Sequence, residues 1–186
     1  MRSPLKNALL AATALLLIGA GNARAQVGTL SNIPTIALTA TKEATLTVTP
    51  STAVATLASI TDNSNANVFT PVSITTDWNL TAGSTVDLIG WFGTPAQALA
   101  NGTDFIPSSR VEGRVNATAY APFTGAAVAG VGVAGGSLQL FSQAVAAGSF
   151  FGTRTDQLEL RLDLTGATTT LAGDYTGTLN LQAVVQ

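Results

Sequence analysis

A run of eight residues with strict two-residue alternation limits the fold of this chain more than any other feature. In QLELRLDL (157–164), leucines occupy every even position, and the charged residues Glu159, Arg161 and Asp163 lie between them. Successive side chains of a β-strand point to opposite faces, so this run predicts a strand with one buried and one exposed face. In a helix the same leucines would spread around the whole circumference.

Similar stretches recur along the chain and are separated by turns rich in Gly, Asn and Pro. The run 175–185 repeats the alternation, and the turn-rich segment 165–174 predicts that it pairs with 157–164 as an antiparallel neighbour. The other predicted strands are 35–40, 43–49, 53–60, 67–78, 85–92, 110–120 and 137–145. This number and spacing of short strands predicts an all-β fold, an antiparallel Ig-like β-sandwich.

Composition also favours sheets over helices. Only 10% of the residues are charged, against roughly 25% in ordinary soluble domains. Threonine is abundant, and this β-branched residue suits the solvent face of a sheet. One short helix is predicted within 94–102, where Thr94 is placed as N-cap, Pro95 as first helical residue and Gly102 just beyond the end.

The first 25 residues have the form of a secretory signal peptide. Two basic residues precede an apolar stretch at 8–20, and Ala-Arg-Ala at 23–25 matches a cleavage site. The apolar stretch is too short to span a bilayer. We therefore expect a single β-sandwich domain over 26–186, secreted to the periplasm or cell surface and without a membrane span.

The absence of two residue types restricts the chemistry of the protein. The chain contains no His and no Cys, which removes disulfides, thiol nucleophiles and the usual zinc and haem ligands. Once the signal peptide is removed, 5 basic and 10 acidic residues remain, so a basic face for nucleic acid is not expected. The ten acids are scattered singly, and we predict a protein that is not an enzyme.

Two local motifs are similar to known kinds of binding site. Gly130, Gly132 and Gly135 spell G-x-G-x-x-G, but flanks that read as antiparallel strands favour a glycine-rich loop over a dinucleotide site. DNSNAN (62–67) offers oxygen ligands at alternate positions, but it lacks the glycine and the closing acid of a calcium loop. A turn explains it better, and we predict neither a cofactor nor a metal site.

The C-terminal segment AGDYTGTLNLQAVV (172–185) carries a family resemblance. A small residue and a glycine precede a tyrosine that opens a Thr-rich alternating strand; the matching residues are Ala172, Gly173, Tyr175, Gly177, Thr178, Leu179 and Leu181. This pattern resembles the closing strand of secreted bacterial fimbrial and spore-coat-U-type domains, and TATKEATLTVTPS (39–51) is similar to their first strand. The resemblance implies a pilin-like sandwich whose copies build surface fibres or coats by strand complementation.

The resemblance leads to a structural function as the first hypothesis: a non-catalytic, exported fibre, pilus or coat subunit that assembles by β-strand pairing. Residues 26–49 would act either as an N-terminal extension that pairs with another copy or as ordinary first strands of their own domain. The implied partners are further copies or other surface subunits, together with an export chaperone. The candidate assembly residues are Ile36, Leu38, Ala40, Leu46, Val48, Tyr175, Leu179 and Leu181.

The alternative is a secreted carbohydrate-binding or adhesin-like module. Trp78 and Trp91 are its candidate ligand platform, since aromatic faces stack on sugars. The competing interpretation of the same residues is packing against a core, which is the commoner role of such side chains.

Overall fold

The computed structural model describes residues 37–148, 150–167 and 170–186. Residues 42–186 form one compact unit. Residues 37–41, the described part of the other unit, have no regular secondary structure. Among the described residues, no helix has the length and apolar character needed to cross a bilayer.

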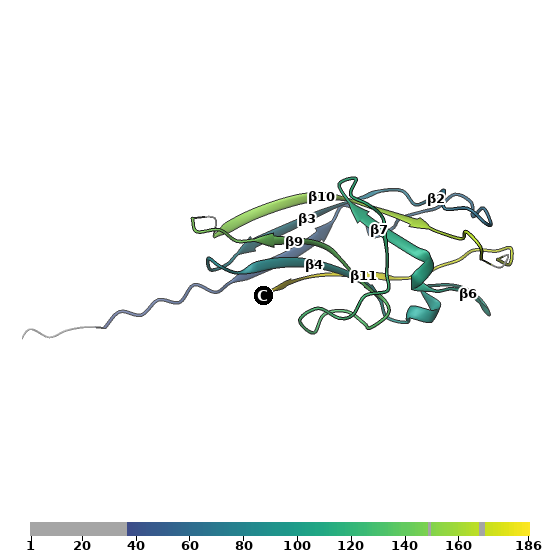
Figure 1. The fold of residues 1–186 in the computed structure, drawn as a ribbon. Coiled ribbons are helices and arrows are strands. Elements are labelled where there is room, and N and C mark those ends of the chain that lie inside the picture. Colours follow the sequence, from purple (N-terminus) through teal and green to yellow (C-terminus); the bar gives the residue numbers. More distant parts are fainter. Residues whose placement is uncertain (1–36, 149, 168–169) are drawn as a thin grey trace, which may run out of the picture. The chain divides into compact units, whose positions relative to one another are not determined.

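The compact unit is an antiparallel β-sandwich (Figure 1). The larger sheet, sheet A, has the strand order β1-β3-β10-β7-β8, and β2 also pairs with β10. The smaller sheet, sheet B, has the order β11-β4-β9, and β5 and β6 form a separate hairpin. The strands of sheet A are β1 (Thr45–Pro50), β2 (Asn67–Val68), β3 (Val72–Asn79), β7 (Val111–Val115), β8 (Ala121–Pro122) and β10 (Phe151–Leu162). The remaining strands are β4 (Thr85–Phe92), β5 (Leu99–Asn101), β6 (Asp104–Ile106), β9 (Ser137–Ala144) and β11 (Leu179–Val185).

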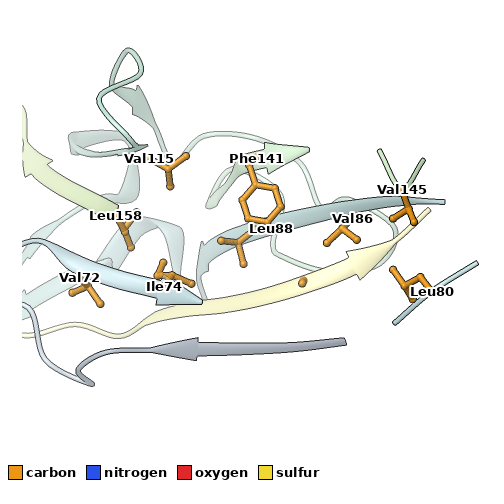
Figure 2. Close-up of a cluster of buried hydrophobic side chains, with 10 residues drawn as sticks. Val72, Ile74, Leu80, Val86, Leu88, Val115, Phe141, Val145 and Leu158 are labelled. Atoms are coloured by element: carbon orange, nitrogen blue, oxygen red, sulfur yellow. The ribbon is translucent and has the colours of Figure 1, made fainter. Parts of the chain in front are cut away.

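The alternating run predicted from the sequence is the second half of β10. Leu158 and Leu162 are buried, and Leu164 just beyond the strand is buried too, whereas Glu159 and Arg161 face away from the core. Figure 2 shows one buried cluster, in which Leu158 and Ile74 from sheet A lie opposite Leu88 and Phe141 from sheet B. The two sheets therefore pack against each other through a shared core, and the prediction of an all-β antiparallel sandwich is confirmed.

The predicted pairing of 157–164 with 175–185 is wrong. β10 pairs with β3 and β2 on one side and with β7 on the other, so both of its edges are occupied. β11 instead pairs with β4 in sheet B, after a connection of 16 residues that crosses from one sheet to the other. Alternation specifies which face of a strand is buried, but it does not specify the neighbouring strand.

The predicted strand 53–60 is also absent, since no residue of this stretch has strand structure. The backbone of Thr56 bonds instead to Thr70, through the amide of Thr70 and the hydroxyl of its side chain. Of the predicted strand 35–40, residues 37–40 are not a strand, and the rest lies outside the described residues. Within 67–78, the chain is interrupted between β2 and β3 at Pro71, which has no backbone N–H to donate.

The predicted helix at 94–102 is reduced to a single 3₁₀ turn, Pro95–Gln97. Thr94 precedes the turn but makes no capping hydrogen bond through its side chain. The chain then enters β5, because Ala98 and Leu99 are buried in the second core cluster and their burial outweighs local helix propensity. A second 3₁₀ turn, Ser108–Arg110, had no clear signal in the sequence.

The glycine-rich stretch 125–136 is an ordered loop that connects β8 to β9. Gly125 forms a bridge to Ser137, and Val128 forms one to Val131. Gly132 has φ +102°, and the Ser137 hydroxyl lies where a Cβ would stand, so only glycine fits there. The loop is thereby tied to the start of β9, with no βαβ unit around it.

Candidate functional site

The two sides of the sandwich differ in how they are closed. On one side, Phe123 after β8 is fully buried and packs edge-on against Phe92, and the Gly125–Ser137 bridge joins the loop to β9. On the other side lie β1 and β11, the edge strands of sheets A and B. Within the described residues, β1 pairs only with β3 and β11 only with β4. The outer backbone groups of β1 and β11 are therefore available for further pairing.

A groove of about 480 Å³ opens between the end of β1, the segment 52–55 that follows it and the start of β11. Its lining is dominated by apolar side chains contributed by both sheets, and its floor reaches the core residues Val72, Leu158 and Phe92. The walls and floor include Val48, Val72, Phe92, Leu158, Leu179 and Leu181. The groove is thus an apolar channel bordered by two unpaired strand edges, which is the geometry that accepts an extended peptide.

Four of the predicted assembly residues lie on the edge strands that border this groove. Leu46 and Val48 of β1 and Leu179 and Leu181 of β11 are half-buried and pack against the core clusters. Val48, Leu179 and Leu181 line the groove itself.

Of the other four predicted assembly residues, three lie in the part of the chain that the structure describes, and none of these three lies in a strand. Leu38 and Ala40 belong to the stretch without regular secondary structure, and Ile36 lies outside the described residues. Tyr175 precedes β11 by four residues and holds a loop in place.

Tyr175 and Asp104 anchor the connection from sheet A to sheet B. The Tyr175 hydroxyl donates to the Asp104 carboxylate, and the Leu171 amide donates to the same carboxylate at 2.9 Å. The hydrogen bond from Tyr175, followed by that from Leu171, lowers the pKa of Asp104. Desolvation, followed by the hydrogen bond to Asp104, raises the pKa of Tyr175.

Side chains of the polar run 62–67 form hydrogen bonds with residues of the same connection. Asp62 accepts hydrogen bonds from the amide and hydroxyl of Thr170, and Asn63 accepts one from the Gly166 amide. Asn67 is buried, and its side chain bonds to Thr61 and Ser64 within the turn. These side chains are engaged with backbone and hydroxyl groups, as in a turn, and the described residues contain no group of three or more acids that could hold a metal ion.

The two tryptophans lie in different settings. Trp78 of β3 packs against the core cluster and stands directly across from Gly152 of β10, with its indole nitrogen buried and without a hydrogen-bond partner. Trp91 of β4 is half-buried, and its carbonyl accepts a hydrogen bond from the Asn180 side chain. The structure therefore does not bring them together as one platform.

Strand β10 takes part in ion pairs on both of its faces. On the core side, Asp156 is buried and accepts hydrogen bonds from Arg154, at 2.6 Å, and from the side-chain amide of Asn116. The Arg154 guanidinium lies 4.3 Å from the ring centroid of Phe141. The even position of Asp156 places it on the leucine face of the strand, among buried side chains.

The outer face of β10 carries a second cluster around Tyr120. Glu159 pairs with Arg114 and Arg161 with Glu112, each at 2.6 Å, and both guanidinium groups lie over the Tyr120 ring. The hydrogen bond from Arg114 lowers the pKa of Glu159, and desolvation raises that of Tyr120. Every acid in these two clusters is bonded to an arginine, within β10 for Asp156 and across the neighbouring strands β7 and β10 for Glu159 and Glu112.

Comparison with known proteins adds no relative. No protein-family model matches the chain, and no curated protein matches it either.

Proposed function

We propose that this protein is an exported structural subunit that assembles with further copies by β-strand pairing. The observation that carries the proposal is the apolar groove between the edge strands β1 and β11. An extended peptide in such a groove gains main-chain hydrogen bonds from the strand edges, and its alternate side chains fill the channel. The signal-peptide pattern of residues 1–25 supports export to the periplasm or cell surface.

The proposed occupant of the groove is the segment 26–41 of another copy. Ile36, Leu38 and Ala40 occupy alternate positions, separated by Ala37 and Thr39, so an extended conformation presents them on one side. The segment has 16 residues, whereas β11 has 7, so its length suffices to pair along the whole groove edge. Residues 45–50 are excluded from this role because they form β1 within their own sandwich.

Before assembly, the groove would leave apolar surface exposed during export. A periplasmic or surface chaperone that binds an extended edge is therefore the partner that fits the unassembled subunit. The sequence resemblance to fimbrial and spore-coat-U-type domains supports the same assignment.

Matched pairs of substitutions test the proposal on the chain 26–186. Leu38→Asp in the donor segment and Val48→Lys in the groove wall should each abolish fibres or large oligomers. Thr39→Asp and Thr47→Lys place the same charges on the neighbouring residues, and both should assemble like the parent. Sedimentation velocity and negative-stain microscopy measure the result.

A labelled peptide of residues 26–41 provides the direct measurement. We expect it to bind a chain that begins at Lys42 and to lose binding when Val48→Lys is introduced. Deletion must stop at residue 41, because deletion through 49 removes most of β1. Absence of peptide binding, together with a parent chain that stays monomeric at high concentration, would refute the proposed function.

The alternative, a carbohydrate-binding module, depends on Trp91, because Trp78 is committed to packing across Gly152. Loss of glycan-array binding on Trp91→Ala, with unchanged folding, would favour this alternative.

A further inference from the structure

Most of the large apolar side chains that the compact unit's described part exposes lie at its two ends; the exception is Val54, which lines the groove. β10 runs the length of sheet A over 12 residues, which corresponds to roughly 40 Å. Its first residue, Phe151, marks one end, and Leu162 marks the other. The exposed large apolar residues of the compact unit's described part are Val54, Val68, Phe105, Phe150, Phe151, Leu171 and Val185.

The first end, here called the root end, is where the chain enters the sandwich. Phe150 and Phe151 lie there beside Lys42, whose ammonium group is 4.6 Å from the Phe151 ring centroid. Phe151 is 66% exposed although it is part of a strand. These residues and Leu80 border a hollow of about 440 Å³. Val185, the last residue of β11, lies at the same end because it pairs with Val86 near the start of β4.

The opposite end, here called the far end, is built from the β5–β6 hairpin and the connection to sheet B (Figure 1). Phe105 lies on the hairpin, and Leu171 is fixed next to it through the hydrogen bond from its amide to Asp104. Leu171 is 62% exposed. Val68 lies at this end too, since it pairs with Arg161 near the end of β10.

The faces of the sheets contrast with the ends. The outer face of sheet A carries Thr47, Thr49, Thr75, Thr153 and Thr155 in register across β1, β3 and β10. Hydroxyl and charged side chains thus cover the flank, while the exposed aromatic and large aliphatic side chains are placed at the termini of the strands. Such a distribution favours contact between ends over contact between faces.

We propose that the root end of one copy docks onto the far end of the next copy, so that Phe150 and Phe151 pack against Phe105 and Leu171. The inference rests on the proposed function, since the donor segment 26–41 leaves the sandwich at Lys42, within the root end. A strand that reaches into the next copy brings this end against that copy. The two contacting surfaces differ, which makes the interface heterologous and lets it propagate as a filament.

The test isolates the end contact from strand pairing by using the chain 26–186 with Leu38→Asp, which disables the donor segment. We expect this chain to form no fibres or large oligomers but to show weak, concentration-dependent association into dimers and other small oligomers in sedimentation velocity. Adding F150S and F151S at the root end, or F105S and L171S at the far end, should raise the concentration needed for association at least about tenfold. Thr153→Ser and Thr155→Ser on the flank are the matched controls and should leave association unchanged.

A mixture of the root-end and far-end variants gives the sharpest outcome. The root-end variant keeps an intact far end, and the far-end variant keeps an intact root end. The mixture should therefore form dimers with one copy of each variant and nothing longer, at a concentration at which each variant alone is monomeric. The proposal is overturned if the Leu38→Asp chain does not associate or if neither set of substitutions weakens association. Binding of the 26–41 peptide, measured separately on the same variants, tells failure of the end contact apart from failure of strand pairing.

Discussion

The contact between Trp78 and Gly152 provides a stability prediction of defined size. The two residues are directly opposed on β3 and β10, and a Cβ added at 152 would lie 2.7 Å from the indole Nε1 and still closer to its six-membered ring. The indole is partly buried against the core, so Gly152→Ala forces it or the strand to move. Overpacking of this kind costs about 1–3 kcal/mol. For a domain of this size, that cost lowers Tm by about 3–10 °C.

Thermal and urea unfolding of the chain 26–186 measure the effect. Gly93→Ala is the matched control: no heavy atom lies within 4 Å of its added Cβ, and its φ is not in the left-handed region. This control should be neutral or stabilising by about 0.4–1 kcal/mol, because alanine restricts the unfolded chain.

A double variant decides whether Trp78 is the cause. Trp78→Leu removes the ring that clashes, so Trp78→Leu with Gly152→Ala should cost about 0.5–3 kcal/mol less than the sum of the two single changes. A Gly152→Ala chain as stable as its parent, or strictly additive costs, would refute the packing of Trp78 across Gly152.

Two further predictions concern the core and the connection between the sheets. Phe123→Ala should lower the free energy of unfolding by about 3–5 kcal/mol in urea titrations, since this side chain is fully buried; a loss below about 1 kcal/mol contradicts its role in closing that side of the sandwich. Asp104 has a lowered pKa in the folded state, so its carboxylate contributes stability at neutral pH that is lost as the pH falls below about 4. The protection factor of the Leu171 amide in hydrogen exchange should therefore fall in acid, and Asp104→Asn should show the lower protection factor already at neutral pH; identical protection factors for the two chains at each pH would count against the anchoring role of Asp104.

The sequence predicted faces and positions of strands better than it predicted their neighbours. The bounds of β4 match the predicted 85–92, and the leucines of β10 are on the buried face as expected. Alternation arises from one face being buried, and it is therefore visible in a single strand. Pairing depends on which distant strand offers a complementary edge, and this information was missing for β10 and β11.

The candidate groove could be predicted only in part for a related reason. Val48, Leu179 and Leu181 were among the candidate assembly residues because they lie in alternating runs. The floor residues Val72 and Phe92 come from consecutive strands that belong to different sheets, and only the stacking of the two sheets brings them together. The strand prediction at 53–60 is wrong because small and β-branched residues there suit an extended segment without strand pairing as well as they suit a strand.

The distance in sequence between β4 and β11 has a consequence for how the molecule folds. β4 begins at Thr85, but one of its two partners is not available until residues 179–185 have been made. Closing so long a loop is slow, and synthesis from the N-terminus leaves the middle strand of sheet B with an open edge until β11 is made. The protein is thus vulnerable to mispairing before β11 is made, and the pairing of β11 with β4 completes sheet B.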